Sequence, residues 1–209
     1  MEVKDREMFH FHKIGIEDYN WKIGNTLNID KYFESNYSII FRNFNTNVKT
    51  NDGYKSIDGI IDYYLKKDFD MEELIKLLKD ARDIIYLTNI FKRELALEYV
   101  RKIKFENLPS RRNSIWVTDS EGINFWKNSL SKTADGKDLK LYKVSLTGII
   151  FMTSDYYIPE DDYLFEHSLR ASENYWNPDF SKIKKDRNEY LFQGKLKIID
   201  LIKCWFYLK

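Results

Sequence analysis

The alternation of hydrophobic and polar positions predicts strands near the start of the chain and in its second half. In MFHFHKIGI, residues 8–16, two phenylalanines alternate with two histidines, and in NSIWVTD, residues 113–119, Ile and Val alternate with Ser, Trp and Thr. A period of two is typical of a strand, because successive side chains point to opposite faces. Two apolar runs also predict strands: residues 139–151, as one piece or as two joined at Gly148, and residues 188–202.

The strongest helical pattern covers residues 70–105. Apolar residues recur there at helical spacing, at Leu74, Leu78, Ala81 and Ile85. Asp70 followed by Glu73 forms a capping-box pattern at its start. The pattern fits one long helix or two helices separated near Thr88 and Asn89.

Three further segments predict helices, at residues 56–69, 120–130 and 161–176. Ser56 is a suitable first N-cap, and Asp119 or Ser120 is a suitable second one. The helices cluster in the first half and most strands follow in the second, which favours an α+β fold over repeated βαβ units. We expect a single domain, residues 1–209, in which about residues 55–105 form a helical insertion beside a β-rich core.

The amino-acid composition limits the binding partners that we expect and the cellular compartment of the protein. The 209 residues are 43% hydrophobic and 32% charged with a net charge of +1, so no overall field attracts nucleic acid or an anionic membrane. Cys204 is the single cysteine, which favours a reducing compartment. The charged N-terminus is unlike a signal peptide, and no apolar run reaches the roughly 18 residues that span a bilayer. We expect a cytoplasmic protein that does not enter membranes.

The FHFHK segment offers two histidines on one face of the first strand. His10 and His12 could ligate a metal, but such a site needs a third ligand. The one other histidine, His167, is on a distant predicted helix, and there is no cysteine cluster. We therefore expect no metal. The alternative is an edge strand whose histidines face solvent or bind backbone groups.

The LPSRRNSIWVTD segment joins two arginines to a strand with an aromatic centre. Arg111 and Arg112 carry planar guanidinium groups that suit a phosphate or a carboxylate. Trp116 lies between Ser114 and Thr118 on one face, which is unusual for a wholly buried strand and favours a cleft wall. The alternative is a pair of solvated loop charges beside a core tryptophan.

Glu189 stands at the start of the last strand. By alternation it shares a face with Leu191 and Gln193, whereas Tyr190 and Phe192 face the other side. A carboxylate in this position is either a solvated charge or a functional group.

Taken in order, these three features resemble the ADP-ribosyltransferase fold, and within it the group whose strands carry His, an aromatic residue and Glu. The stretch RELALEYVRKIKFENLPSRRNSIWVTD followed by NEYLFQG resembles an uncharacterised bacterial domain family grouped with those enzymes. The resemblance covers roughly residues 9–200. It implies a split β-sheet core, and it implies mono-ADP-ribosyl transfer from NAD, which is consumed as substrate without a metal.

The resemblance also assigns roles to residues. It implies that Glu189 is catalytic and that His12, or His10 as its competitor, binds the adenosine ribose. Trp116 replaces the more usual Tyr, which keeps a stacking surface for the nicotinamide but removes a hydroxyl. Arg111 would meet the pyrophosphate, and the site would include the hydroxyl residues on either side of Trp116, which are Ser114 and Thr118.

Other functions fit the same residues. A non-catalytic binding or effector module on this fold, an NAD glycohydrolase, and a phosphotransferase acting on RNA ends are the alternatives. The acceptor of ADP-ribose could be a protein or a nucleic acid. A bacterial or phage toxin or effector is the class of protein that the resemblance suggests, and the oligomeric state is open.

Overall fold

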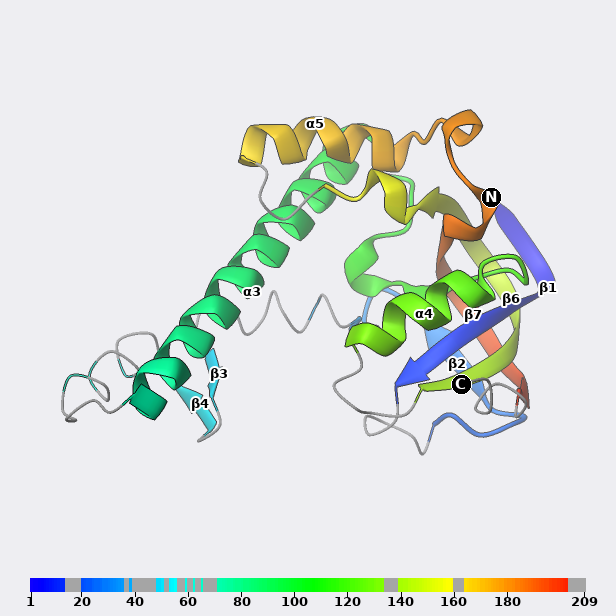
Figure 1. Cartoon of the computed structure of the whole chain (residues 1–209). Helices are drawn as coiled ribbons and strands as arrows, with labels where there is room; N and C mark the ends of the chain where they lie inside the picture. Colours follow the sequence, from blue (N-terminus) through cyan, green and yellow to red (C-terminus); the bar gives the residue numbers. More distant parts are fainter. Residues whose placement is uncertain are drawn as a thin grey trace.

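The computed structural model describes residues 1–13, 20–35, 71–133, 139–159 and 164–202, residues 38, 59, 62 and 65, and the backbone of a two-stranded pair. That pair is β3 (Val48–Thr50) and β4 (Gly53–Lys55). The fold mixes helices with an antiparallel five-stranded sheet (Figure 1). The helix predicted over residues 56–69 lies almost wholly outside the described residues.

The five-stranded sheet is built around its last strand. β7 (Asn188–Leu201) pairs along its length with β6 (Leu139–Ser154), which in turn pairs with β1 (Glu2–Lys13). On its other side, β7 pairs first with β5 (Ile115–Val117) and then with β2 (Thr26–Ile29). The strands predicted from the alternation and the apolar runs are confirmed, although the first begins earlier, at Glu2, and residues 14–16 of its predicted range lie outside the described residues.

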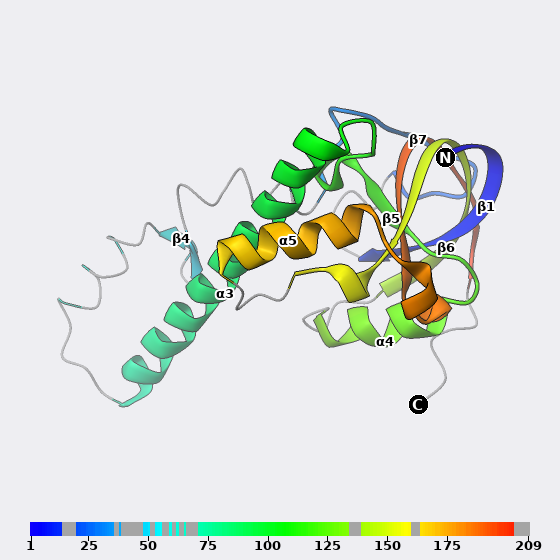
Figure 2. The ribbon, with the colours of Figure 1, turned by 90° about the horizontal axis from the view of Figure 1, so that it is seen from above.

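A short bridge joins β1 to the end of β5. The Phe9 N–H donates to the Thr118 carbonyl at 2.9 Å, and the Thr118 N–H donates to the Phe9 carbonyl at 2.8 Å. The strands β1, β6, β7 and β5 therefore form a barrel-like ring, and Figure 2 shows how strongly they curve. The inside of this ring holds the main hydrophobic core, which includes Met8, Ile115, Val117, Val144, Leu146, Ile150, Tyr190, Phe192, Leu196 and Ile198.

Two glycines face each other where β6 and β7 bend. Gly148 pairs with Gly194, and their φ angles are +154° and +140°. A β-carbon on Gly148 would lie 2.3 Å from the Gln193 carbonyl oxygen, and one on Gly194 would lie 2.4 Å from the Thr147 carbonyl oxygen. The two strands approach closely at this point because neither residue has a side chain. Strand β6 is thus one continuous strand with a glycine bend.

Two helices pack together on the outer face of the sheet, which is the face directed away from the inside of the strand ring. α3 (Met71–Lys104) is a single helix, and its second half packs against α5 (Phe165–Trp176) and β7 (Figures 1 and 2). The Trp176 indole N–H donates to the Leu97 carbonyl at 2.7 Å. The second half of α3 therefore belongs to the packed core. Only its first half fits the helical insertion expected over about residues 55–105.

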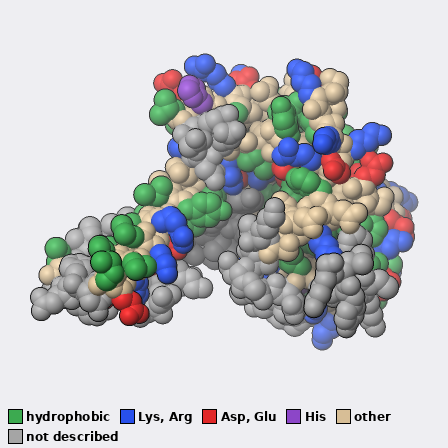
Figure 3. All heavy atoms as spheres, in the orientation of Figure 1, with side chains coloured by type: hydrophobic (Ala, Val, Ile, Leu, Met, Phe, Trp, Pro, Cys, Tyr) green, Lys and Arg blue, Asp and Glu red, His purple; other side chains and the backbone are tan. Residues whose placement is uncertain are grey.

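The first half of α3 projects away from the sheet and exposes apolar side chains (Figure 3), namely Met71, Leu74, Ile75, Leu78 and Ile85. Within the described part of the chain, no helix is both long and apolar enough to cross a membrane.

The other helices in the described parts of the chain are short. α4 (Ile123–Thr133) follows β5, and Asp119, one of the two predicted caps, accepts a hydrogen bond from the Gly122 N–H at 3.0 Å. The single-turn 3-10 helices are η1 (Arg111–Asn113), η2 (Asp155–Tyr157), η3 (Phe180–Lys182) and η4 (Lys185–Arg187).

The glycine bend gives a stability prediction. We expect Gly194→Ala to lower the free energy of unfolding by about 2–4 kcal/mol, because the methyl group meets backbone atoms and the positive φ strains any L side chain. Gly24→Ala is the matched control, since Gly24 has a φ of +91° but no described atom within 4 Å of the added carbon. Its loss should be about 1 kcal/mol, from strain alone. Urea unfolding measures both, and equal losses would contradict the close approach of β6 and β7.

Candidate functional site

Glu189 is a buried carboxylate on the outer face of the sheet. It is 4% exposed and lies on the same side of β7 as Leu191, which packs under α3 and α5. Its Oε1 atom accepts hydrogen bonds from the Arg111 Nη1 group at 2.8 Å and from the Tyr175 hydroxyl. Glu189 is therefore held by one charged and one neutral donor, away from bulk water.

Arg111 lies at the centre of the site and is 2% exposed. Besides Glu189, its guanidinium binds the carboxylate of Glu94 on α3, with Nε at 2.9 Å and Nη2 at 3.2 Å. Its Cζ atom lies 5.2 Å from the ring centre of Trp116 and 4.9 Å from that of Tyr175. One planar cation thus sits between two carboxylates and beside two aromatic rings. We call Glu94, Arg111, Trp116, Tyr175 and Glu189 the Arg111 cluster.

Burial controls the protonation of the Arg111 cluster. Burial raises the pKa of the Glu189 carboxyl above 4.5, and the neighbouring Arg111 charge offsets this only in part. Burial also raises the pKa of the Tyr175 phenol well above 10.0, so this hydroxyl keeps its proton and remains a donor. Arg93 adds a further cation, with its Nε atom 3.4 Å from Glu94 Oε1.

Trp116 and its flanking hydroxyls lie on this same outer face. Trp116 pairs with Leu191 and is half-buried, whereas Ser114 and Thr118 are buried. The Ser114 hydroxyl donates to the Ser110 carbonyl at 2.6 Å. The hydroxyls on either side of Trp116 therefore do not line an open wall, because backbone and packing contacts cover them.

The two histidines lie on the inner face of the sheet with Met8. The Trp21 ring stacks on both, at 4.5 Å from the His10 ring and 4.6 Å from the His12 ring. The structure therefore does not bring the His12 side chain together with those of Glu189 and Trp116.

The His10 side chain nevertheless contacts β5, through a backbone carbonyl of that strand. Its Nδ1–H donates to the Trp116 carbonyl at 2.7 Å, since a carbonyl can only accept. Burial lowers the pKa of His10 to about 4, so the ring is neutral at physiological pH. His10 fixes the position of β5 without entering the Arg111 cluster.

Arg112 differs from Arg111 in its burial. It is half-buried, and its carbonyl accepts from the Ser35 N–H at 3.0 Å and the Ser38 hydroxyl at 2.5 Å. Arg111 binds the carboxylates of Glu94 and Glu189. Because two carboxylates already bind it, its charge is not available to a phosphate in this arrangement.

Sequence reasoning missed Glu94 and Tyr175. Glu94 recurs with Ile90 and Leu97 on the buried face of α3, and a carboxylate on an apolar helix face signals a buried partner. Tyr175 ends α5 beside Trp176, and nothing in the local pattern distinguishes it from a core aromatic residue.

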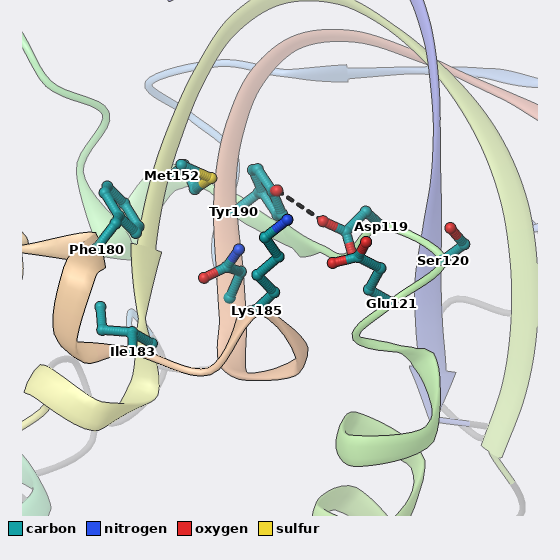
Figure 4. Close-up of a pocket in the computed structure, with 9 residues that line it drawn as sticks. Asp119, Ser120, Glu121, Met152, Phe180, Ile183, Lys185 and Tyr190 are labelled. Atoms are coloured by element: carbon teal, nitrogen blue, oxygen red, sulfur yellow. Dashed lines mark hydrogen bonds between the residues drawn. The ribbon is translucent and has the colours of Figure 1, made fainter.

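A pocket of about 400 Å³ opens on the other side of the start of β7 (Figure 4). Asn188 and Tyr190 line it, and they alternate with Glu189, so the pocket lies back to back with the Arg111 cluster. The other lining residues are Asp119, Ser120, Glu121, Met152, Phe180, Ile183 and Lys185. Among the described residues, no group of three or more His, Cys, Asp or Glu could hold a metal ion.

Residues 8–204 match the family described as "Protein of unknown function (DUF2441)". The chain belongs to this family. No curated protein matches the chain. The match to the DUF2441 family spans the whole Arg111 cluster, both histidines and the pocket.

Substitutions that remove different charges from the Arg111 cluster should lower the stability by unequal amounts. We expect Arg111→Met to lower the free energy of unfolding by about 3–5 kcal/mol, because buried Glu189 loses its ion pair and buried Glu94 keeps only the longer contact with Arg93. Glu189→Gln should cost about 1 kcal/mol or less, since the amide oxygen still accepts from Arg111 and Tyr175. Urea unfolding at neutral pH measures both, and equal losses would contradict the cluster.

The pH dependence of Glu189→Gln follows from the raised pKa of Glu189. A carboxyl whose folded-state pKa exceeds its unfolded value of 4.5 stabilises fully below that value, and this contribution is lost as pH rises through the folded-state pKa. Gln does not titrate. The stability of wild type relative to Glu189→Gln should therefore fall as the pH rises above 4.5. A relative stability that increases as the pH rises above 4.5 would show a lowered pKa instead.

Proposed function

We propose that this protein is an NAD-dependent ADP-ribosyltransferase-like enzyme that transfers ADP-ribose to a protein or nucleic-acid acceptor. One observation carries the proposal. Trp116 and Glu189 lie on adjacent antiparallel strands and face the same side, with the Arg111 guanidinium in contact with both.

The aromatic ring of Trp116 and the carboxylate of Glu189 suit the nicotinamide of NAD. The nicotinamide ring is a planar cation, and the site already holds a planar cation, the Arg111 guanidinium, against an aromatic ring and a carboxylate. The same two groups, Trp116 and Glu189, would bind the substrate ring. Because both cations cannot occupy this place, the Arg111 side chain has to move before substrate reaches Glu189.

Glu189 would act on the charge that develops during the reaction. The bond from C1′ of the ribose to the nicotinamide nitrogen breaks, and its electron pair leaves with neutral nicotinamide. Positive charge then develops on the ribose, as in glycoside cleavage, and a fixed carboxylate stabilises it. An acceptor nucleophile forms the new bond to C1′ and loses its proton.

Tyr175 would position this carboxylate. Its hydroxyl donates to Glu189 Oε1, so one donor holds the carboxylate even when Arg111 moves. This supplies a phenol next to the catalytic group, although Trp116 itself has none. His10 would position Trp116 through its carbonyl, and the proposal gives His12 no contact with the reacting bond, because its ring lies on the inner face.

A second candidate function is a non-catalytic binding module on the same fold. The burial of Glu189 and its ion pair with Arg111 favour it, because a carboxylate that is 4% exposed has little access to substrate. In that case the Arg111 cluster serves only to join α3 and α5 to the sheet.

Nicotinamide release separates these functions. We expect wild type to release nicotinamide from NAD, and Glu189→Gln to do so about 10²–10³-fold more slowly. NAD affinity should change little, because the ribose charge develops only in the transition state. Glu166→Gln, at an exposed position of α5, is the matched control and should retain full turnover.

Other results of the nicotinamide-release assay would point to different functions. Equal turnover by wild type and Glu189→Gln would remove Glu189 from the mechanism. No turnover and no NAD binding by wild type would support the non-catalytic module. Release of nicotinamide with no labelled acceptor in a cell lysate would instead indicate an NAD glycohydrolase.

A further inference from the structure

The pocket on the far side of β7 has its own chemistry, which the proposed transfer reaction does not use. Figure 4 shows carboxylates along one wall, apolar side chains along the opposite wall and a lysine between them. We propose that this pocket binds a small zwitterion of the amino-acid type with an apolar side chain.

The acidic wall is built to hold an ammonium group. Asp119 Oδ1 accepts from the Gly122 N–H at 3.0 Å, and Oδ2 accepts from the Tyr190 hydroxyl at 2.8 Å. These bonds fix the carboxylate and leave each oxygen with a further lone pair for a ligand. Glu121 lies beside it on the same wall and is exposed.

Tyr190 is fixed in turn. Burial raises the pKa of its phenol above 10.0, so the hydroxyl keeps its proton and continues to donate to Asp119. The Arg6 guanidinium lies 5.5 Å from the Tyr190 ring centre, which anchors the ring by a cation–π contact.

Lys185 supplies the opposite charge. It comes from η4, and its side chain extends between the acidic and apolar walls (Figure 4). Among the described residues, no hydrogen bond or ion pair engages its ammonium group, so its three donors can meet a carboxylate. Asn188 also lines the pocket and adds an amide.

The apolar wall receives a hydrophobic side chain. Met152 and Phe180 are 36% and 39% exposed, so an apolar ligand group would remove hydrophobic surface from water. Ile183 completes this wall. The volume of about 400 Å³ lies within the usual range of small-molecule sites, roughly 300–1,000 Å³.

A zwitterion suits this arrangement better than a ligand of one charge. An amine without a carboxylate would meet Lys185 as a like charge, and an acid without an amine would meet Asp119 and Glu121 in the same way. A ligand with both groups pairs with each wall at once.

Calorimetric titration with three matched ligands tests the proposal. L-leucine has both charges, 3-methylbutylamine lacks the carboxylate, and 4-methylpentanoate lacks the ammonium, while all three keep the same branched apolar end. We expect leucine to bind more tightly than either analogue by about fivefold or more, the value of one partly exposed charge pair. Absence of leucine binding up to its solubility limit, or equal binding of an analogue, would overturn the proposal.

Lysine variants place the binding in this pocket. Lys185→Met should reduce leucine affinity to that for 3-methylbutylamine, and it should not weaken the amine itself. Lys184→Met is the matched control, because this neighbouring exposed lysine does not line the pocket, and it should leave leucine affinity unchanged. Loss of binding in both variants, or in neither, would contradict the assignment. Because this test measures no turnover, it is independent of the proposed transferase function.

Discussion

The burial of the Arg111 guanidinium is the constraint on which the outer face of this protein depends. A buried cation needs carboxylate partners, and it takes one from helix α3, Glu94, and one from strand β7, Glu189. Tyr175 on α5 contacts both Arg111 and Glu189. One charge therefore joins the two covering helices to the sheet, and it also places a carboxylate beside an aromatic ring.

Much of the fold could be predicted because it follows from local periodicity. The alternation around Trp116, the apolar run after Glu189 and the helical spacing over residues 70–105 each predict one element, and all three elements form. The close approach at Gly148 and Gly194 could not be predicted, since it depends on which strands pair. The packing of the second half of α3 on the sheet likewise depends on its contact with α5.

The candidate site was harder to predict, for a physical reason. Alternation gives the face of a side chain but not what covers that face, so Glu189 has the same pattern whether it is solvated or buried. The side to which His12 points was equally undetermined, because a strand with phenylalanine on one face and histidine on the other can bury either. Glu94 and Tyr175 come from helices distant in the sequence, and tertiary packing alone brings them to Arg111.

A crystal structure of the protein with NAD tests most directly the claim that the Arg111 cluster is a substrate site. We predict that the nicotinamide ring stacks on Trp116 next to Glu189, and that the Arg111 guanidinium leaves the place it now occupies between them. NAD bound elsewhere, with the Arg111–Glu189 ion pair intact at its present 2.8 Å, would contradict this prediction and leave the Arg111 cluster a purely structural role.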